Sequence, residues 1–296
     1  MRECFRALRP KQWTKNVLVF AGLFFDQQFF DQVALLRVSL CFLLCCALSS
    51  AVYLINDLVD LESDRKHPTK RNRPLAAGSL SPRIAQVAAV ILLAVSLLGS
   101  YAIAIRLFVV FIIYLALQVL YNLWLKKVII IDIMVVSAGF ILRVAVGTVV
   151  IQVAQFSPWL YICTAWLALF LVVGKRRQDA ILLADSAAGS STDIRKYPRG
   201  LLDEMLRVIT TATLIAYLIY TIEVEQATIG GVNLALITTV FVFYSLMRYL
   251  QLILENQQAS APEEVLFSDR PLQIAIVLWA LSFLFILYVL APIASS

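Results

Sequence analysis

Four oxygen-bearing side chains recur at helical spacing where a long apolar segment ends: Asn56, Asp57, Asp60 and Asp64. At 100° per residue they fall within about a quarter of a helix surface, whereas Glu62 points elsewhere. Carboxylates this close repel one another unless a cation or a basic side chain lies between them. Hard oxygen ligands that leave coordination positions open suit Mg²⁺ that bridges to substrate phosphates. We therefore predict all four residues as Mg²⁺ ligands and the three aspartates as catalytic; the alternative is a solvated acidic helix end.

Basic residues follow the acidic segment directly, with five Lys or Arg between Arg65 and Arg73. Retention of positive charge at the cytoplasmic face of a membrane accounts for some of them. A metal-bound diphosphate surrounded by basic side chains accounts for the adjacency of acids and bases. Lys70, Arg71 and Arg73 are therefore predicted to bind substrate phosphates. His67, the only histidine, is expected to hydrogen-bond within its loop rather than to catalyse.

The composition indicates that a membrane carries these groups. Apolar residues make up 61% of the 296 residues and charged residues only 15%, compared with about a quarter charged in soluble domains. This excludes disordered, nucleic-acid-binding and disulfide-framework proteins and disfavours a soluble enzyme. The apolar runs are continuous over about twenty residues, which is typical of membrane helices rather than of the alternating strands of a β-barrel.

We predict an all-α polytopic membrane protein that forms one domain over residues 1–296. The nine expected spans are 14–30, 33–58, 82–104, 107–125, 128–151, 157–175, 205–225, 229–250 and 272–293. Polar loops near 63–82, 176–204 and 251–271 form a cytoplasmic cap. The first span is the weakest, because Lys15 and Asn16 stand at one end and Asp26 at the other.

The basic residues predict the orientation. Twenty-two of the 25 Lys and Arg residues fall on one side of the nine spans. The positive-inside rule then puts the N-terminus in the cytoplasm and the C-terminus across the plasma (inner) membrane, with the acidic cluster facing the cytoplasm.

The pattern N-D-x-x-D-x-x-x-D from Asn56 to Asp64 resembles the first motif of the UbiA superfamily of intramembrane prenyltransferases. The resemblance implies a helical bundle around a central cavity that opens laterally to lipid. Most members join a polyprenyl diphosphate to an aromatic or other acceptor, and they carry a second motif, D-x-x-x-D, near the end of helix six. This chain departs from that pattern, because Lys175, Arg176 and Arg177 precede a single acid, Asp179, at that point.

A different branch, the decaprenyl-phosphate phosphoribosyltransferases, is more similar. The similar segments are Leu8–Asn16, Asn56–Gly78, Gly174–Arg177, which we expect to form a turn, and Asp269–Pro271. The resemblance implies transfer of 5-phosphoribosyl from phosphoribosyl diphosphate (PRPP) to a polyprenyl phosphate, with release of diphosphate, for cell-envelope glycolipid precursors. The alternative is a prenyltransferase that uses a polyprenyl diphosphate and an aromatic acceptor. A transporter is disfavoured, because transporters place their charged sites near the bilayer midplane.

The balance of charge favours the phosphoribosyl reaction. PRPP and a lipid phosphate together bring three anionic groups, so one metal-bridged site and several basic clusters are needed. Lys11, Lys15, Lys126, Lys175 and Arg176 are therefore predicted to bind substrate. Lys11 and Lys15 are expected to share a helix face if the first helix begins that early. The positive-inside rule is the structural alternative for each cluster.

Two further residues are predicted to bind substrate. Tyr121 precedes Lys126 much as a Tyr and a Lys stand in UbiA relatives, although the spacing differs. Arg143 lies inside the fifth span, and an intramembrane Arg is costly enough that it usually lines a polar cavity; contact with backbone carbonyls is the alternative. The stretch Asp185–Gly200 is either a lid or a plain loop. A homo-oligomer is left open, and no nucleic-acid partner is expected.

Overall fold

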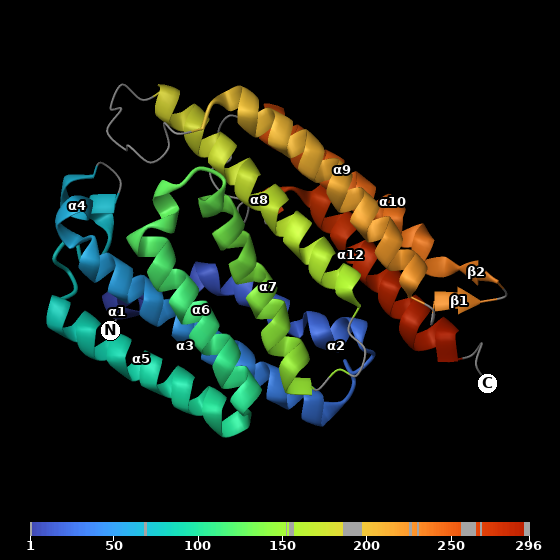
Figure 1. Ribbon diagram of the computed structural model, residues 1–296, viewed down its shortest axis with the longest axis horizontal. Coiled ribbons are helices and arrows are strands. Elements are labelled where there is room, and N and C mark those ends of the chain that lie inside the picture. Colours follow the sequence, from blue (N-terminus) through green and yellow to red (C-terminus); the bar gives the residue numbers. More distant parts are fainter. Residues whose placement is uncertain are drawn as a thin grey trace. The chain divides into compact units, whose positions relative to one another are not determined.

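The structure is a computed structural model. It describes residues 2–67, 70–151, 153, 157–185, 197–224, 227–229, 231–255, 265–266 and 268–292. The regular secondary structure of these residues is helical apart from one two-stranded antiparallel ribbon, β1 (Thr228–Ile229) and β2 (Val232–Asn233) (Figure 1). Eight helices in the described part are long and apolar enough to cross a membrane. The prediction of an all-α polytopic membrane protein is therefore confirmed.

The chain divides into two compact units. Unit 1 comprises Met1–Trp124 and Leu142–Ala154, and unit 2 comprises Leu125–Ile141 and Gln155–Ser296.

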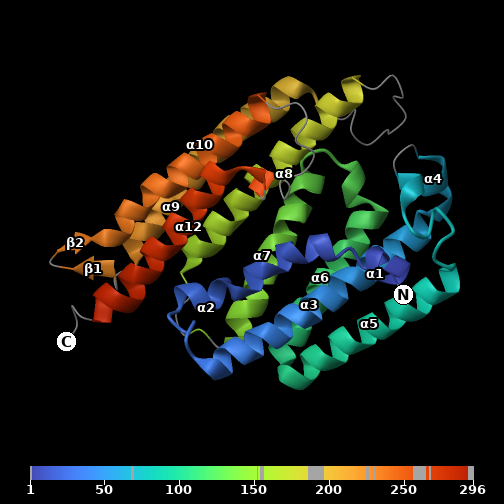
Figure 2. The ribbon, with the colours of Figure 1, turned by 180° about the vertical axis from the view of Figure 1, so that it is seen from behind.

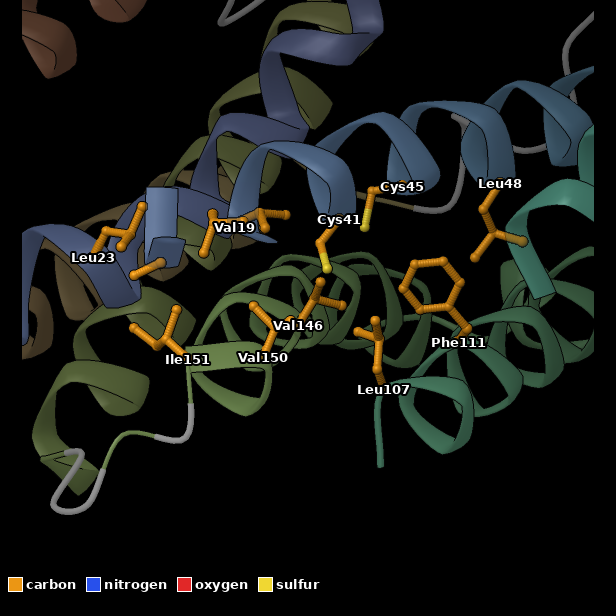
Figure 3. Packing of buried hydrophobic residues seen from close by; sticks show 12 residues of the cluster. Val19, Leu23, Cys41, Cys45, Leu48, Leu107, Phe111, Val146, Val150 and Ile151 are labelled. Carbon is orange, nitrogen blue, oxygen red and sulfur yellow. The ribbon is translucent and has the colours of Figure 1, made fainter. Parts of the chain in front are cut away.

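Unit 1 is built around α3, which packs most extensively against α5 and against the N-terminal 3₁₀ helix η1. Asp31 caps α3 by accepting hydrogen bonds from the backbone N–H groups of Val33 and Ala34, and Ser81 caps α5 in the same way. A buried apolar cluster that includes Val19 and Phe111 forms the core (Figure 3). The elements are α1 (Arg2–Ala7), η1 (Pro10–Phe20), α2 (Ala21–Phe25), α3 (Gln32–Val59), α4 (Leu61–Lys66), η2 (Lys70–Asn72), α5 (Pro82–Ile103), α6 (Ile105–Leu123) and the second half of α7 (Ile131–Ile151).

The first predicted span is not an α-helix of spanning length, so that prediction is wrong in helix type. Residues Pro10–Phe20 form a 3₁₀ helix and α2 adds five residues. At rises of about 2.0 and 1.5 Å per residue, the two together extend about 30 Å, which matches the hydrocarbon thickness of a bilayer. The count of nine crossings, on which the predicted orientation depends, is therefore retained as a prediction.

Side-chain hydrogen bonds and a glycine explain why this tighter helix forms. Trp13 donates to Ser50 Oγ over 3.0 Å, and the buried Asn16 donates to Ser49 Oγ over 3.3 Å, so η1 runs antiparallel along α3. On the α7 side, a Cβ atom on Gly147 would lie only 1.9 Å from the carbonyl oxygen of Val19. The backbone of η1 thus packs directly on α7 where an added side chain would collide.

Unit 2 is dominated by the pairing of α8 with α9, and α10 packs against α9 and α12 (Figures 1 and 2). Its core contains Phe170, Leu202, Leu206, Tyr249 and Ile253. The elements are η3 (Leu125–Lys127), the first half of α7, α8 (Pro158–Asp185), α9 (Arg199–Glu223), β1, β2, η5 (Leu234–Thr238), α10 (Thr239–Glu255) and α12 (Arg270–Phe285), which a π-helical turn, Ile286–Leu290, extends.

Helix α8 continues about ten residues beyond the predicted end of the sixth span. The segment Gly174–Arg177 is therefore helical and not the turn that we expected. The helix persists because Arg177 has partners within the protein: its guanidinium donates to Asp203 over 2.5 Å and to the carbonyl of Ile253 over 3.0 Å. Of the predicted lid, residues 186–196 lie outside the described part of the chain, as do 256–264 of the third polar loop.

Candidate active site

The acidic segment forms a nearly continuous helix across the end of α3. The backbone N–H of Asp60 donates to the carbonyl of Asn56 over 2.9 Å, and that of Asp64 donates to Asp60 over 2.8 Å. These α-helical bonds bring Asp57 and Asp64, which are two helical turns apart, to one face. Both side chains are buried, and each residue is only 2% exposed. Glu62 is exposed and pairs with Arg65, as its predicted direction requires.

Two arginines neutralise the buried carboxylates. Arg73 Nη1 lies 3.1 Å from Asp57 Oδ1 and 2.6 Å from Asp64 Oδ2, and Arg9 Nη2 lies 2.5 Å from Asp57 Oδ1. Arg9 adopts a left-handed backbone (φ 54°), and its guanidinium lies 4.9 Å from the ring centroid of Tyr53. We call Arg9, Asp57, Asp64 and Arg73 the Asp57 cluster. The expectation that a cation or basic side chain separates the acids is met by Arg73.

The cluster offers a cation position between two carboxylates. Among the described residues, no group of three His, Cys, Asp or Glu side chains is arranged to hold a metal. The amide oxygen of Asn56 accepts a hydrogen bond from Asn122 over 2.7 Å, and the half-buried Asp60 takes no part in the Arg9 and Arg73 ion pairs. Mg²⁺ is usually bound by one or two carboxylates together with water and substrate phosphates. Asp57 and Asp64 therefore fit a metal whose coordination the substrate completes.

The loop after α4 presents the other predicted basic residues to solvent. Lys70 and Arg71 are exposed on η2, and the backbone N–H of Lys70 donates to His67 Nδ1 over 3.3 Å. Burial, reinforced by the charge of Lys70, lowers the pKa of His67, so its imidazole is neutral and can accept this bond. His67 thus hydrogen-bonds within its loop, as predicted.

The helix that contains Lys11 and Lys15 does begin that early, but the two residues do not share a face of it, contrary to the expectation. Both residues lie in η1, and with 3.0 residues per turn, positions four apart are about 120° apart around a 3₁₀ helix. Lys11 is exposed and Lys15 is half-buried. Their roles in substrate binding stay predictions.

Arg143 lies in a buried polar group within unit 1. The residue is 8% exposed; its Nε donates to Asn16 Oδ1 over 2.7 Å and its Nη2 to Tyr114 Oη over 3.1 Å. Its guanidinium also lies 5.1 Å from the Tyr114 ring centroid. These residues line a small cavity together with Cys45 and Phe111. Arg143 thus lines a small cavity within unit 1, whereas its place in a substrate cavity and its contact with substrate stay predictions.

In unit 2, the predicted phosphate ligand Arg176 has a carboxylate partner. Its Nη2 lies 3.0 Å from Asp132 Oδ2. The other oxygen of Asp132 accepts a hydrogen bond from the hydroxyl of Tyr197, which in turn accepts one from the backbone N–H of Ile130 over 2.6 Å. Burial, reinforced by the hydrogen bond to Asp132, raises the pKa of Tyr197 to about 12, so the phenol stays protonated. We call Asp132, Arg176 and Tyr197 the Asp132 cluster.

For three other predicted substrate ligands, the structure gives the position on a helix and the degree of burial. Lys175 is half-buried on α8, one turn before Asp179, and Lys126 is half-buried on η3. Tyr121 is half-buried in the last turn of α6. Their roles stay predictions.

Sequence reasoning did not assign Arg9, Asn122 or Tyr197 to a site. Arg9 stands inside the segment Leu8–Asn16 that carries the resemblance, which was a usable signal. No signal in the sequence marks Asn122 or Tyr197, because each hydrogen-bonds to a residue more than sixty positions away.

Comparison with known proteins agrees with the fold and the motif. A sequence profile of the UbiA prenyltransferase family matches residues 17–268. The decaprenyl-phosphate phosphoribosyltransferase of Corynebacterium glutamicum is 33% identical over 289 residues, which cover 96% of this chain and 86% of the relative. The enzyme of the same name from Mycobacterium tuberculosis is 32% identical over 278 residues, covering 93% of this chain and 90% of the relative.

Solved structures support the same conclusion about the fold. A UbiA homolog from Archaeoglobus fulgidus bound to GPP and Mg²⁺ superposes with a TM-score of 0.69 at 18% identity, covering 97% of this chain and 100% of that one. A UbiA homolog from Aeropyrum pernix K1 gives 0.64 at 18% identity, covering 91% and 96%. The family profile spans most of the chain, and the helices and the aspartate motif agree with it: the chain belongs to the UbiA prenyltransferase family.

Proposed function

We propose that the protein transfers the 5-phosphoribosyl group of PRPP to a polyprenyl phosphate of the decaprenyl type and releases diphosphate. The relatives from Corynebacterium and Mycobacterium carry the name of this activity, and they are similar over more than nine-tenths of this chain. The observation that carries the proposal is the Asp57 cluster, in which buried carboxylates and arginines alternate within hydrogen-bonding distance. Such a mixture suits a diphosphate that brings a metal ion with it.

The chemistry requires charge and position more than covalent help. The bond from ribose C1 to the diphosphate oxygen breaks through an oxocarbenium-like state, and an oxygen of the lipid phosphate forms the new bond to C1. The lipid phosphate is already anionic at neutral pH, so no strong general base is needed. Asp57 and Asp64 would hold the cation that accompanies the diphosphate, and Arg9 and Arg73 would bind phosphate oxygens directly. A divalent cation, which we propose to be Mg²⁺, supplies positive charge to the leaving group when bound.

Unit 2 supports PRPP rather than a prenyl diphosphate as the donor. Most UbiA relatives are expected to carry a second pair of acids near the end of the sixth span, where this chain has Lys175, Arg176 and Arg177 on α8. Cations there suit an additional phosphate group. Lys175 and Arg176 are therefore proposed to bind a phosphate, and Arg176 would exchange its contact with Asp132 for it.

We also propose that the protein forms one domain in the plasma membrane with the Asp57 cluster facing the cytoplasm. The asymmetry of Lys and Arg supports this orientation. In a cysteine-free background, a cysteine replacing the exposed Asn72 is expected to escape an impermeant thiol reagent in intact cells and to react in opened ones. Labelling of intact cells would reverse the orientation.

The decisive experiment measures the lipid product. Purified protein in nanodiscs receives labelled PRPP, decaprenyl phosphate and Mg²⁺, and the lipid fraction is separated by thin-layer chromatography. A labelled lipid that is absent with Asp64→Ala and present with the exposed-site control Glu62→Ala supports the proposal. If the protein ignored PRPP but prenylated an aromatic acid from polyprenyl diphosphate, the alternative activity would replace it.

A further inference from the structure

Arg73 occupies the position that a cation shared by two carboxylates would take. Its Nη1 lies 3.1 Å from Asp57 Oδ1 and 2.6 Å from Asp64 Oδ2. Mg²⁺ binds carboxylate oxygens at about 2.0–2.1 Å, so the ion and the guanidinium nitrogen cannot both lie between the same two oxygens. The guanidinium is also charged at every physiological pH. A metal that binds these two oxygens, Asp57 Oδ1 and Asp64 Oδ2, therefore has to displace Arg73.

The side chain of Arg73 can move away from this position, whereas the carboxylates of Asp57 and Asp64 cannot. Asp57 and Asp64 are held on α3 and α4, and both are buried. Arg73 instead belongs to the non-helical connection after η2, and its side chain is 28% exposed, which leaves a path to solvent and substrate. Displacement would leave a guanidinium without its carboxylates beside a bound diphosphate, and the diphosphate oxygens are suitable bidentate acceptors.

We infer that Arg73 neutralises Asp57 and Asp64 until substrate binds, and that the metal ion arriving with the substrate then replaces it. Without substrate, Arg73 bridges Asp57 and Asp64; when PRPP arrives with a divalent metal, Arg73 yields the carboxylates and turns to the diphosphate. This inference rests on the proposed function for the identity of the substrate. Arg9 keeps one carboxylate of the pair neutralised during the exchange, because it contacts Asp57 and not Asp64.

The exchange predicts that metal and diphosphate bind synergistically. Metal alone would have to displace Arg73 without giving it a new anionic partner. Diphosphate alone would have to draw Arg73 away and leave two buried carboxylates without their shared cation. Each ligand therefore raises the affinity for the other by the same factor.

Binding of Mn²⁺ tests the inference without turnover. Electron paramagnetic resonance measures Mn²⁺ bound to the nanodisc-embedded protein with and without inorganic diphosphate, against protein-free blanks that correct for the Mn²⁺–diphosphate complex in solution. For the wild type we expect diphosphate to tighten Mn²⁺ binding by about tenfold or more, which is about 1.4 kcal/mol of coupling. For Arg73→Gln we expect Mn²⁺ alone to bind about tenfold more tightly than to the wild type, and the effect of diphosphate to be largely lost.

Two variants serve as controls. Arg65→Gln removes an exposed arginine that pairs with Glu62 outside the cluster, and we expect the wild-type pattern. Arg73→Lys keeps the positive charge but not the bidentate guanidinium, so Mn²⁺ alone is expected to bind as weakly as to the wild type. It also keeps the inference testable if Arg73→Gln does not fold.

Weaker binding of Mn²⁺ alone to Arg73→Gln would overturn the inference, because Arg73 would then support the carboxylates rather than compete for them. Binding without synergy in the wild type would overturn it as well. Failure of the proposed function is a separate result, since it appears as absence of product from PRPP and leaves the Mn²⁺ measurements unaffected.

Discussion

The Asp57 cluster and the Asp132 cluster place buried aspartates beside arginines in two different ways. In the first, two carboxylates converge on one nitrogen of Arg73. In the second, the two oxygens of one carboxylate have separate donors, Arg176 and Tyr197. Shared donors can be exchanged for a stronger cation, whereas separate donors tie neighbouring elements together. We therefore assign the metal-dependent step to the Asp57 cluster and expect Tyr197 of the Asp132 cluster to act on stability, whereas Arg176 is the proposed phosphate ligand.

Backbone strain accompanies both clusters. Arg9 and Ile130 have positive φ values of 54° and 70°, which for residues with a Cβ costs about 1–2 kcal/mol each. Arg9 extends its guanidinium to Asp57, and Ile130, a β-branched residue, donates its N–H to Tyr197. In each cluster a strained residue next to a helix start provides a contact to the buried acid or to its partner.

The largest expected effect is on turnover, and it differs between the variants Asp64→Ala and Asp60→Ala. Asp64→Ala removes one of the two carboxylates that share a cation, and we expect turnover with PRPP to fall by about a hundredfold or more, or about 2.7 kcal/mol of barrier. Asp60→Ala, which leaves the ion pairs intact, is expected to cost less than about tenfold. Initial rates of labelled lipid formation measure both. Equal losses of turnover in the two variants would show that Asp60 contributes as much to the reaction as Asp64.

A pair of glycine substitutions compares the packing of the two units. Gly147→Ala would place a Cβ 1.9 Å from a backbone oxygen of η1, so we expect a loss of about 1–3 kcal/mol or more of stability. Gly174→Ala would place its Cβ 2.7 Å from the flexible end of Ile253, which can move, so a smaller loss is expected. Thermal unfolding in detergent measures both variants. A reversed order would mean that the contact of η1 with α7 is looser than described.

Tyr197→Phe tests whether the Asp132 cluster is structural. The ring remains, but Asp132 loses one donor and Ile130 loses its acceptor, so we expect a loss of about 1–3 kcal/mol of stability. Turnover per folded molecule is expected to stay near the wild-type value, because Tyr197 is not among the proposed substrate ligands and Arg176 is retained. A large fall in turnover with an unchanged unfolding temperature would instead assign this cluster to the reaction.

The smallest effect concerns a half-buried ion pair in unit 2. Asp269 caps α12 and accepts two hydrogen bonds from Arg248, at 3.2 and 2.8 Å, and these bonds lower the pKa of its carboxyl. A lowered pKa contributes stability above the ordinary aspartate value of about 3.9 that disappears as pH falls through the folded-state pKa. Asp269→Asn keeps the cap, so its unfolding temperature should lie slightly below the wild type at pH 7. The difference should shrink as pH falls below the ordinary aspartate pKa of about 3.9 and through the lower folded-state pKa; a constant difference would exclude the ion pair as the cause.

The membrane helices were predictable because the signal is local. Apolar runs about as long as a bilayer is thick appear directly in the sequence, and eight of the nine expected spans have helical counterparts in the described residues. The common face of Asp57 and Asp64 and the outward direction of Glu62 also follow from helical periodicity alone. The end of α8 did not follow, since Arg177 extends the helix through contacts with α9 and α10.

By itself, the sequence determined the all-α membrane class, the acidic helix face and the family. Only the tertiary structure decided which cations meet those acids. Arg9 and Arg73 lie 48 and 16 positions from Asp57, and Tyr197 lies 65 positions from Asp132. It also decided that the first span is a 3₁₀ helix, because the contacts of Asn16 and the space beside Gly147 come from other helices. Periodicity specifies the face on which a residue lies, whereas the partner of a charged side chain depends on how distant segments pack.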